Sequence, residues 1–353
     1  MTVLARLTDG RVSIQCDLCI PPNLTTNTPA ELRRTHWALR ELGEQLDACS
    51  NCAAHISVRD RRARRDPVPV EPDADRLPTL VIIGAAKAGT TSMLNYLDVH
   101  PEVAVSREKE MRFFQDPDYL SWVGLYQEHF PTGTRHRAEA SPAYAKSPCN
   151  PGVVDRMADL VPDAKILYLV RDPIDRVVAE YVEELQWLAA GGTLDERVAD
   201  ADLLDNSLVA SSRYATQLKE YRRRFSPDQI MVVDLADLSA DVVGVMGGVF
   251  DFLGLERPSM SHEDFGRHNT REDKRMFPDW VMRLRRGPLV RTYHRIPERP
   301  RRFISDLAWR RFRAPVERPE LGDESRRILE KVLAPEVAEL RVLTGQPFAT
   351  WSL

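Results

Sequence analysis

Hydrophobic positions along residues 79–353 follow two alternating patterns. Short apolar runs at 80–84, 166–170 and 230–234 are rich in Val, Ile and Leu, which is typical of buried strands. Between these runs apolar residues recur at helical spacing, as in residues 93–97. Alternating strand and helix patterns predict an α/β fold, here a three-layer sandwich with a central parallel sheet.

The first of these strand runs ends in a turn of small residues. Residues 84–89 read GAAKAG, and residues 90–92 (TTS) then open a helical pattern. A strand that turns through glycine into a helix directs several backbone N–H groups and the positive end of the helix dipole at one point. The small side chains let an anion approach the backbone closely. The turn therefore predicts a P-loop-like anion site, and the alternative is an ordinary connection between a strand and a helix.

The position of the lysine in this turn separates it from the best-known phosphate loop. A P-loop that hydrolyses nucleotides reads G-x-x-x-x-G-K-[ST], with the lysine directly after the second glycine. In this chain Thr90 follows Gly89, and Lys87 lies inside the turn. We therefore expect a different donor chemistry.

The segment 87–92 (KAGTTS), placed after an apolar strand, resembles the 5′-phosphosulfate loop of sulfotransferases that use 3′-phosphoadenosine 5′-phosphosulfate as donor. The resemblance covers residues 79–353 and is strongest for the carbohydrate and small-molecule branch. Each matching segment is short, but their common order makes the resemblance specific. The further segments that resemble the family are 100–103 (HPEV), 109–114 (KEMRFF), 139–144 (EASPAY), 171–176 (RDPIDR), 250–255 (FDFLGL) and 274–278 (KRMFP).

The resemblance implies a reaction and roles for single residues. A sulfuryl group would pass by in-line displacement to a hydroxyl or amine of a carbohydrate, lipid or natural-product acceptor. Lys87 would stabilise the charge that grows on the leaving oxygen, and Glu110 would be the general base. Phe113 and Phe114 would help to dry the pocket and raise the pKa of Glu110. Magnesium is not obligatory, because the transferred group has less charge than a phosphate.

The resemblance also implies which residues hold the donor. The turn would bind the 5′-phosphosulfate, Arg171 would pair with the 3′-phosphate in a bidentate manner, and a late loop would complete the site. His100 and His136 are weaker alternatives to Glu110 as the base. The residues implied in donor binding are Ala86, Lys87, Ala88, Gly89, Thr90, Thr91, Ser92, Arg171, Lys274, Arg275, Met276 and Phe277.

Two positions depart from the family pattern. Ala179 stands where the family has a serine, so one hydroxyl contact to the 3′-phosphate is missing. Ala140 stands where the heparan-modifying relatives have a lysine. The second departure argues against a glycosaminoglycan acceptor.

Composition narrows the class of protein further. The net charge of −4 gives no electrostatic reason to expect a nucleic-acid partner. No apolar stretch is long enough for a membrane span, and the first ten residues lack a signal-peptide core, so we expect a cytoplasmic protein. Only seven of the 49 basic residues are lysine, yet Lys87, Lys109 and Lys274 fall in the matching segments. Residues 283–313 hold eleven arginines, either as a solvated surface or as a basic rim for an acidic acceptor.

Four cysteines in residues 1–58 form two C-x-x-C pairs. Cys16 and Cys19 precede a segment with a helical pattern, and Cys49 and Cys52 follow it. This spacing predicts a small module with one structural Zn²⁺, while disulfides, an iron–sulfur cluster or a redox pair are the alternatives. Residues 59–78, rich in arginine and proline, are predicted to be a linker to a sulfotransferase-like domain at 79–353.

Two other functions remain open from the sequence. The chain could be a P-loop nucleotide-dependent kinase, with Asp234 as a magnesium ligand after the apolar run at 230–234. It could also be a non-catalytic adaptor that works through its zinc module. The sequence identifies neither the acceptor nor the oligomeric state.

Overall fold

The structure is a computed structural model. It describes residues 70–187, 193–265 and 319–353, with short strands at 2–6, 12–15, 24–26, 275–276 and 314–315. Several predicted residues lie outside the described ones: the zinc ligands Cys16, Cys19, Cys49 and Cys52, the donor-loop residues Lys274 and Phe277, and the arginine-rich segment 283–313.

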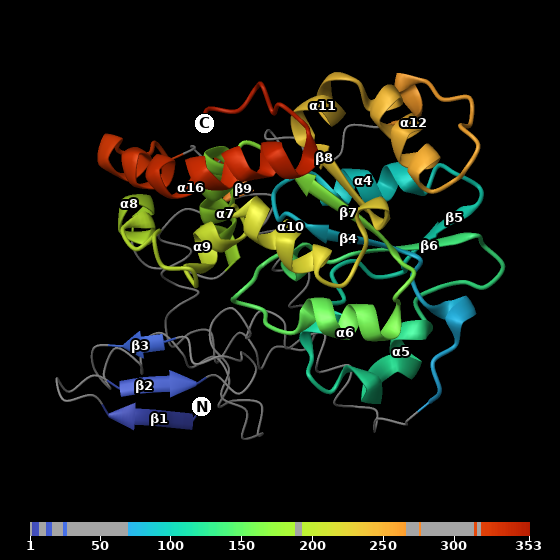
Figure 1. Ribbon diagram of the computed structural model, residues 1–353, viewed down its shortest axis with the longest axis horizontal. Coiled ribbons are helices and arrows are strands. Elements are labelled where there is room, and N and C mark those ends of the chain that lie inside the picture. Colours follow the sequence, from blue (N-terminus) through green and yellow to red (C-terminus); the bar gives the residue numbers. More distant parts are fainter. Residues whose placement is uncertain are drawn as a thin grey trace.

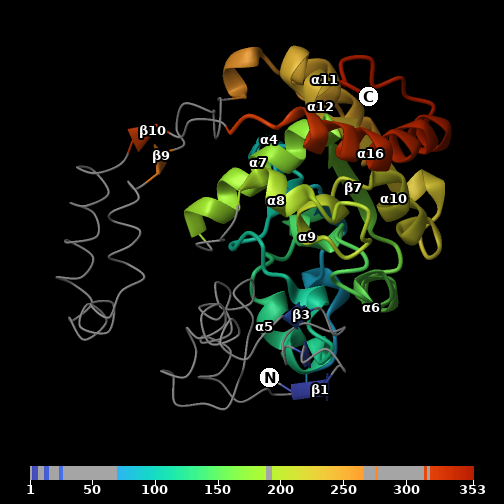
Figure 2. The same cartoon turned by 90° about the vertical axis from the view of Figure 1, so that its left-hand side faces the viewer.

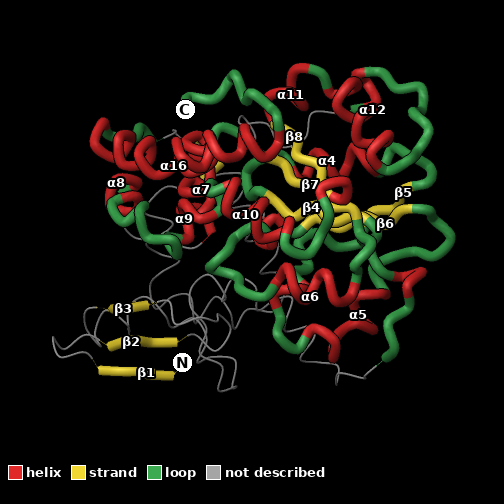
Figure 3. The backbone as a smooth tube through the Cα atoms, in the orientation of Figure 1, coloured by secondary structure: helices red, strands yellow, loops and turns green. Residues whose placement is uncertain are grey.

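A five-stranded parallel sheet forms the centre of the molecule (Figure 3). Its strand order is β5-β6-β4-β7-β8, and every neighbouring pair is parallel. The strands are β4 (Leu80–Gly84), β5 (Val103–Val105), β6 (His136–Ala140), β7 (Lys165–Val170) and β8 (Ile230–Asp234). The predicted parallel sheet is therefore confirmed, and β4, β7 and β8 coincide with the three apolar runs.

Helices lie on both sides of this sheet. In Figures 1 and 2, α4, α11 and α12 lie above the strands, and α5 and α6 lie below them. This is the layered arrangement expected from the alternating pattern. The helices are α4 (Thr90–Leu97), α5 (Val123–Gln127), α6 (Val153–Leu160), α7 (Pro173–Trp187), α8 (Leu194–Val198), α9 (Ser207–Ala210), α10 (Tyr214–Arg222), α11 (Leu235–Ala240), α12 (Val242–Phe252) and α16 (Asp323–Thr344).

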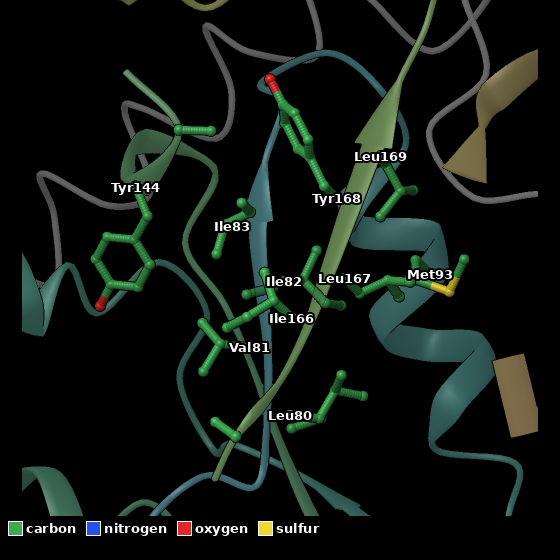
Figure 4. Packing of buried hydrophobic residues seen from close by; sticks show 14 of the residues in the cluster. Leu80, Val81, Ile82, Ile83, Met93, Tyr144, Ile166, Leu167, Tyr168 and Leu169 are labelled. Carbon is green, nitrogen blue, oxygen red and sulfur yellow. The ribbon is translucent and has the colours of Figure 1, made fainter. Parts of the chain in front are cut away.

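The two central strands are buried on both faces. All five residues of β4 are buried, and so are residues 166–170 of β7. Figure 4 shows Met93 of α4 and Tyr144 of the 3-10 turn η5 (Pro142–Tyr144) on opposite sides of these strands. Helices on both faces explain why β4 and β7 are continuous apolar runs rather than alternating ones.

Helix α4 follows from the spacing of its apolar residues. Thr90, Met93, Leu94 and Leu97 are buried, which places positions i, i+3, i+4 and i+7 on one face against the core. The helix ends at Leu97, and Pro101 follows after a short turn. Its first turn is thereby held at the carboxyl end of β4.

Strand β6 was not predicted, because its sequence HRAEA contains two charged residues that are both buried. Arg137 donates to the carbonyl oxygens of Leu77 (2.6 Å), Thr134 (3.0 Å) and Ala74 (3.2 Å). Residues 74–77 thus pack against the sheet. The domain boundaries at 58 and 78 stay a prediction.

Two smaller pairings complete the described chain. The strands β1 (Thr2–Arg6), β2 (Val12–Gln15) and β3 (Leu24–Thr26) form an antiparallel sheet in that order. The strand β9 (Arg275–Met276) pairs antiparallel with β10 (Ala314–Pro315). Among the residues that the structure describes, no helix is long and apolar enough to cross a membrane.

Candidate functional site

The carboxyl ends of β4, β6 and β7 meet at one edge of the sheet. After β4 the chain crosses to β5, which lies with β6 on one side of β4 in the sheet. The strands β7 and β8 lie on the other side of β4. The loop after β4 is therefore at the topological switch point, which is where open α/β sheets bind ligands. The predicted anion loop lies at this place.

The loop at residues 85–89 is held tightly against neighbouring elements. The Ala85 N–H donates to the Leu169 carbonyl of β7 at 2.6 Å, and the Ala88 N–H donates to the Ala85 carbonyl at 3.1 Å. Gly89 has a φ of +89°, and a Cβ there would lie 2.8 Å from Leu235 Cδ1. Lys87 also adopts a left-handed backbone, with a φ of +68°. The left-handed backbone favours glycine at position 89, where a Cβ would also meet the end of the Leu235 side chain.

Helix α4 begins directly after this loop, and the backbone N–H groups of its first turn point toward the loop. These groups have no acceptor within their own helix, as at every helix N-terminus, and they form a site for an anion. Lys109, from the segment after β5, brings its ammonium there and donates to Thr91 Oγ1 at 2.6 Å. Lys109 was not among the predicted donor ligands, although it lies in one of the matching segments.

Glu110, the predicted base, lies beside this turn between two cations. Its Oε1 accepts from Lys109 Nζ at 3.0 Å, and its Oε2 lies 3.7 Å from an Arg112 guanidinium nitrogen. Its side chain is 42% exposed, so that an acceptor has access to it. A cation thus lies beside each carboxylate oxygen.

The expected role of Phe113 and Phe114 is not what the structure shows. Both rings are fully buried in an aromatic cluster rather than lining a pocket around Glu110. Phe113 stacks on Tyr126 with ring centroids 3.8 Å apart, and Phe114 packs against Tyr144 at 5.6 Å. The rings anchor the segment beneath the carboxylate. They do not dry the carboxylate itself.

A buried carboxylate supports the Glu110 segment from below. Glu139 of β6 is fully buried and accepts hydrogen bonds from Ser141 Oγ (2.7 Å), from the Tyr144 hydroxyl (2.8 Å) and from the Tyr126 hydroxyl. Burial raises the pKa of Glu139 above its usual range, and the three hydroxyl donors act in the opposite direction. The network explains why Glu139, Ser141 and Tyr144 occur together in the segment 139–144, and it adds Tyr126 from α5.

This network reaches the base through the backbone. Ser141 Oγ also accepts from the Arg112 N–H at 3.1 Å, and the Glu110 N–H donates to the Ala140 carbonyl at 2.9 Å. Glu110 and Arg112 both have left-handed backbones, with φ values of +60° and +54°. The end of β6 therefore sets the conformation from which Glu110 extends.

Arg171 follows β7 and contacts the loop from the other side. Its Nη1 donates to the Lys87 carbonyl and its Nη2 donates to Asp175 Oδ2, both at 3.2 Å. Asp172 accepts from the Asp175 N–H at 2.9 Å and from the Ser352 N–H at 2.6 Å. The C-terminal segment thus helps to fix the start of α7, just after Arg171.

The second arginine of this segment has a different role. Arg176 is fully buried and binds Ser212 Oγ and the Leu208 carbonyl, and it lies 3.7 Å from Glu180. It therefore joins α7 to the neighbouring segment. Ala179, at the position of the family serine, is only partly buried.

The side chain of Lys87 pairs with Glu183 of α7. The lysine side chain is 17% exposed and the glutamate 44% exposed. The two residues are 96 positions apart, and no short motif joins them, so sequence reasoning missed Glu183. The only signal was that α7 follows the arginine segment and therefore starts at the same edge of the sheet.

The residues of the alternative mechanisms, the possible magnesium ligand Asp234 and the possible bases His100 and His136, make structural contacts instead. Asp234 caps α11 through the Ala236 N–H at 3.1 Å and accepts from Trp351 Nε1 at 3.0 Å, while burial raises its pKa. These contacts do not favour the kinase alternative. His100 accepts from the Glu102 N–H and donates to the Glu256 carbonyl, and His136 begins β6 at the opposite edge of the sheet. Neither histidine is placed as the base.

The late donor loop and the zinc ligands cannot be placed around this site, since Lys274, Phe277 and the four N-terminal cysteines lie outside the described residues. Arg275 and Met276 lie on β9, paired with β10. Within the described ranges, no group of three or more His, Cys, Asp and Glu side chains is arranged to hold a metal ion.

Comparison with known proteins finds similarity to sulfotransferases. Residues 115–259 match the sequence model described as "Sulfotransferase family". Heparan sulfate glucosamine 3-O-sulfotransferase 3B1 of Mus musculus is 31% identical over 190 residues, which are 52% of this chain and 47% of the relative. Bifunctional heparan sulfate N-deacetylase/N-sulfotransferase 3 of Homo sapiens is 25% identical over 317 residues, covering 83% of this chain and 33% of the relative. The chain thus spans less than half the length of these relatives.

A solved structure shows the same fold. The sulfotransferase from Alicyclobacillus acidocaldarius superposes with a TM-score of 0.54 at 24% identity, covering 78% of this chain and 99% of that protein. The match of residues 115–259 and the similarity to these relatives agree with the resemblance to sulfotransferases, and the solved structure has the same fold.

Proposed function

We propose that this protein transfers a sulfuryl group from 3′-phosphoadenosine 5′-phosphosulfate to a hydroxyl or amine, with a carbohydrate as the first acceptor class to test. The observation that supports this best is the convergence of three elements on the first turn of α4. The loop after β4 brings Lys87, the segment after β5 brings Lys109 and Glu110, and the turn between β7 and α7 brings Arg171.

The donor is held by charge and by backbone dipoles in this proposal. Lys87 and the N–H groups of residues 89–92 receive the 5′-phosphosulfate, and Arg171 receives the 3′-phosphate. As the bond from sulfur to the bridging oxygen breaks, negative charge grows on that oxygen. The compact ammonium of Lys87 stabilises this charge at the moment when it forms.

The acceptor is activated by Glu110. Its carboxylate takes the proton of the acceptor hydroxyl while the oxygen attacks sulfur in line with the leaving group. The Glu139 network holds the segment in which Glu110 lies, so that the carboxylate is presented in a defined direction. Sulfuryl transfer, like phosphoryl transfer, depends mainly on such positioning and on charge stabilisation.

The acceptor class follows from the relatives. Several of them are named for heparan sulfate, which supports a carbohydrate acceptor. Ala140, at the position of the lysine in the heparan-modifying relatives, is fully buried and offers no cation to an acidic polymer. We therefore propose a neutral or amino-sugar acceptor before a sulfated glycosaminoglycan, with lipid and natural-product alcohols as further classes.

The direct test is transfer of labelled sulfate. Purified protein is incubated with labelled donor and a panel of neutral oligosaccharides, amino-sugar oligosaccharides, heparan sulfate and simple alcohols, and labelled acceptor is measured. The proposal predicts labelled product and release of adenosine 3′,5′-bisphosphate. Lack of product with every class, while ATP with Mg²⁺ phosphorylates one of them, would contradict it.

For residues 1–58 we propose a structural zinc module. The two C-x-x-C pairs provide four thiolates, and a segment this short needs a metal to fold. Metal analysis should find about one zinc per chain, with Zn–S distances of about 2.3 Å by X-ray absorption. A Cys16→Ser/Cys19→Ser variant should lose the metal and keep binding of adenosine 3′,5′-bisphosphate. Four cysteines found in disulfides would contradict the proposal.

A further inference from the structure

Helix α7 places an acidic side chain on each of the two cations that the proposed donor needs. Asp175, in its first turn, contacts the Arg171 guanidinium, and Glu183, two turns later, contacts the Lys87 ammonium. Eight residues of α-helix span about 12 Å, so the two carboxylates lie about two turns apart along α7. The arginine and the lysine are therefore both neutralised from the same helix.

The contact at Lys87 is the more unusual of the two. Asp175 and Arg171 are four positions apart, a spacing that brings side chains together on or near any helix. Lys87 and Glu183 come from two elements that are far apart in the sequence. Their contact therefore depends on the tertiary fold, which brings α7 alongside the loop after β4.

Lys87 is held at both ends by the α7 segment. Its carbonyl accepts from Arg171 Nη1 at 3.2 Å, while its ammonium meets Glu183. The backbone of Lys87 is left-handed as well, which limits the directions in which its side chain can extend. Glu183 thus fixes the direction of the ammonium that the proposed reaction uses.

A carboxylate on this ammonium competes with the donor. The phosphosulfate and the Glu183 carboxylate are both anions, and a lysine ammonium that neutralises one is less available to the other. Since the Glu183 side chain is 44% exposed, it has room to leave without disturbing the core. We infer that Glu183 is an exchangeable counter-ion of Lys87, which holds the lysine in place until the donor displaces it.

This inference rests on the proposed donor, and it concerns a positioning residue rather than a catalytic one. It predicts that removing the charge of Glu183 strengthens binding of the donor product. Calorimetry with adenosine 3′,5′-bisphosphate should show a dissociation constant about 2- to 5-fold lower for Glu183→Gln than for the unchanged protein, in the range of a partly exposed ion pair.

A matched control separates this contact from a change in overall charge. Glu339 of α16 is 43% exposed and pairs with Lys219 away from the sheet edge. Glu339→Gln removes the same charge and should leave the dissociation constant unchanged. If it strengthens binding as much as Glu183→Gln does, the effect comes from net charge, and the inference is wrong.

A double-mutant cycle tests the partner directly. In a Lys87→Met background the counter-ion has nothing to hold, so adding Glu183→Gln should change the dissociation constant by less than about twofold. An equal gain with and without Lys87 would overturn the exchange. Unchanged binding in Glu183→Gln alone would overturn it too, while the donor assignment would stand. If the unchanged protein does not bind adenosine 3′,5′-bisphosphate, the donor assignment and the exchange both fail.

Discussion

The two edges of the β-sheet hold their polar side chains in different ways. At the amino edge, Arg137 and His136 bind backbone carbonyls of distant segments. At the carboxyl edge, Lys87, Lys109 and Arg171 bind side-chain carboxylates and a hydroxyl, several of which are partly exposed, and Arg171 also binds the Lys87 carbonyl.

We relate this difference to two roles of the polar side chains, stabilising the fold at the amino edge and binding ligands at the carboxyl edge. A backbone carbonyl that is fixed by the fold cannot turn away, so a bond to it stabilises one conformation. A cation can exchange a half-exposed carboxylate for another anion at small cost. We therefore expect substitutions at the amino edge to change unfolding, and substitutions at the carboxyl edge to change binding and turnover.

The largest effect is expected at Glu110. Glu110→Gln keeps the shape of the side chain and removes the base, so turnover should fall about 10²- to 10⁴-fold in the sulfuryl-transfer assay. Binding of adenosine 3′,5′-bisphosphate should hardly change, because the donor product does not need the base.

Glu102 provides the control from the other edge. Its side chain is 46% exposed and lies 3.7 Å from Arg135, similar to the surroundings of Glu110. Glu102→Gln should keep full turnover. If Glu110→Gln loses donor-product binding together with turnover, Glu110 holds the loop and is not the base.

A somewhat smaller loss is expected at Lys87. Lys87→Ala should lower turnover about 10²- to 10³-fold, as expected when one electrostatic contact to the transition state is lost. Lys87→Arg should restore only part of it, because a planar guanidinium does not replace a compact ammonium. Lys165 donates to the Asp228 carbonyl at the amino edge, and Lys165→Ala should leave turnover unchanged. Full turnover in folded Lys87→Ala would refute its assigned role.

Arg137 and Arg171 allow the stability of the two edges to be compared. Arg137→Met removes three hydrogen bonds to backbone carbonyls and should lower the free energy of unfolding by about 2–4 kcal/mol, measured by chemical denaturation. Arg171→Met should cost less stability and weaken binding of adenosine 3′,5′-bisphosphate instead. If Arg137→Met and Arg171→Met lose the same stability and bind adenosine 3′,5′-bisphosphate equally well, the proposed difference between the edges is wrong.

The smallest effect is a pH dependence at the amino edge. Burial lowers the pKa of His136, whose Nε2–H donates to the Leu253 carbonyl at 3.0 Å. The unfolded chain takes up a proton near pH 6.5 while the folded chain resists it, so His136 costs stability as the pH falls below about 6.5. His136→Gln cannot titrate, and the stability of the unchanged protein relative to this variant should fall from about pH 8 to pH 5.5. A difference that stays constant would show that His136 does not titrate in this way.

The strands and helices that sequence reasoning predicted are those whose signals are local. The run at 80–84, its glycines and the spacing of Met93, Leu94 and Leu97 all lie within one stretch, and they gave β4, the loop and α4. Strand β6 was missed because Arg137 and Glu139 are buried against partners elsewhere in the chain. A local pattern contains no information about such partners.

The same limit applies to the site. The segments around Lys87, Glu110 and Arg171 were predicted from motifs, and the fold brings them to one edge of the sheet. Glu183 has no motif, and its role depends on how α7 lies along the loop. The predicted drying by Phe113 was wrong, since the ring stacks on Tyr126 in the core, and a sequence does not say which way an aromatic ring points.

The central claim is that the loop after β4 binds a phosphosulfate donor rather than a nucleoside triphosphate. Thermal unfolding with adenosine 3′,5′-bisphosphate, and separately with ATP and Mg²⁺, tests this claim most directly. At a 100-fold excess over its dissociation constant, the bisphosphate should raise the melting temperature by about 3–8 °C. ATP with Mg²⁺ should raise it less, and Arg171→Met should reduce the gain from the bisphosphate. A larger shift with ATP and Mg²⁺ than with the bisphosphate would contradict the account.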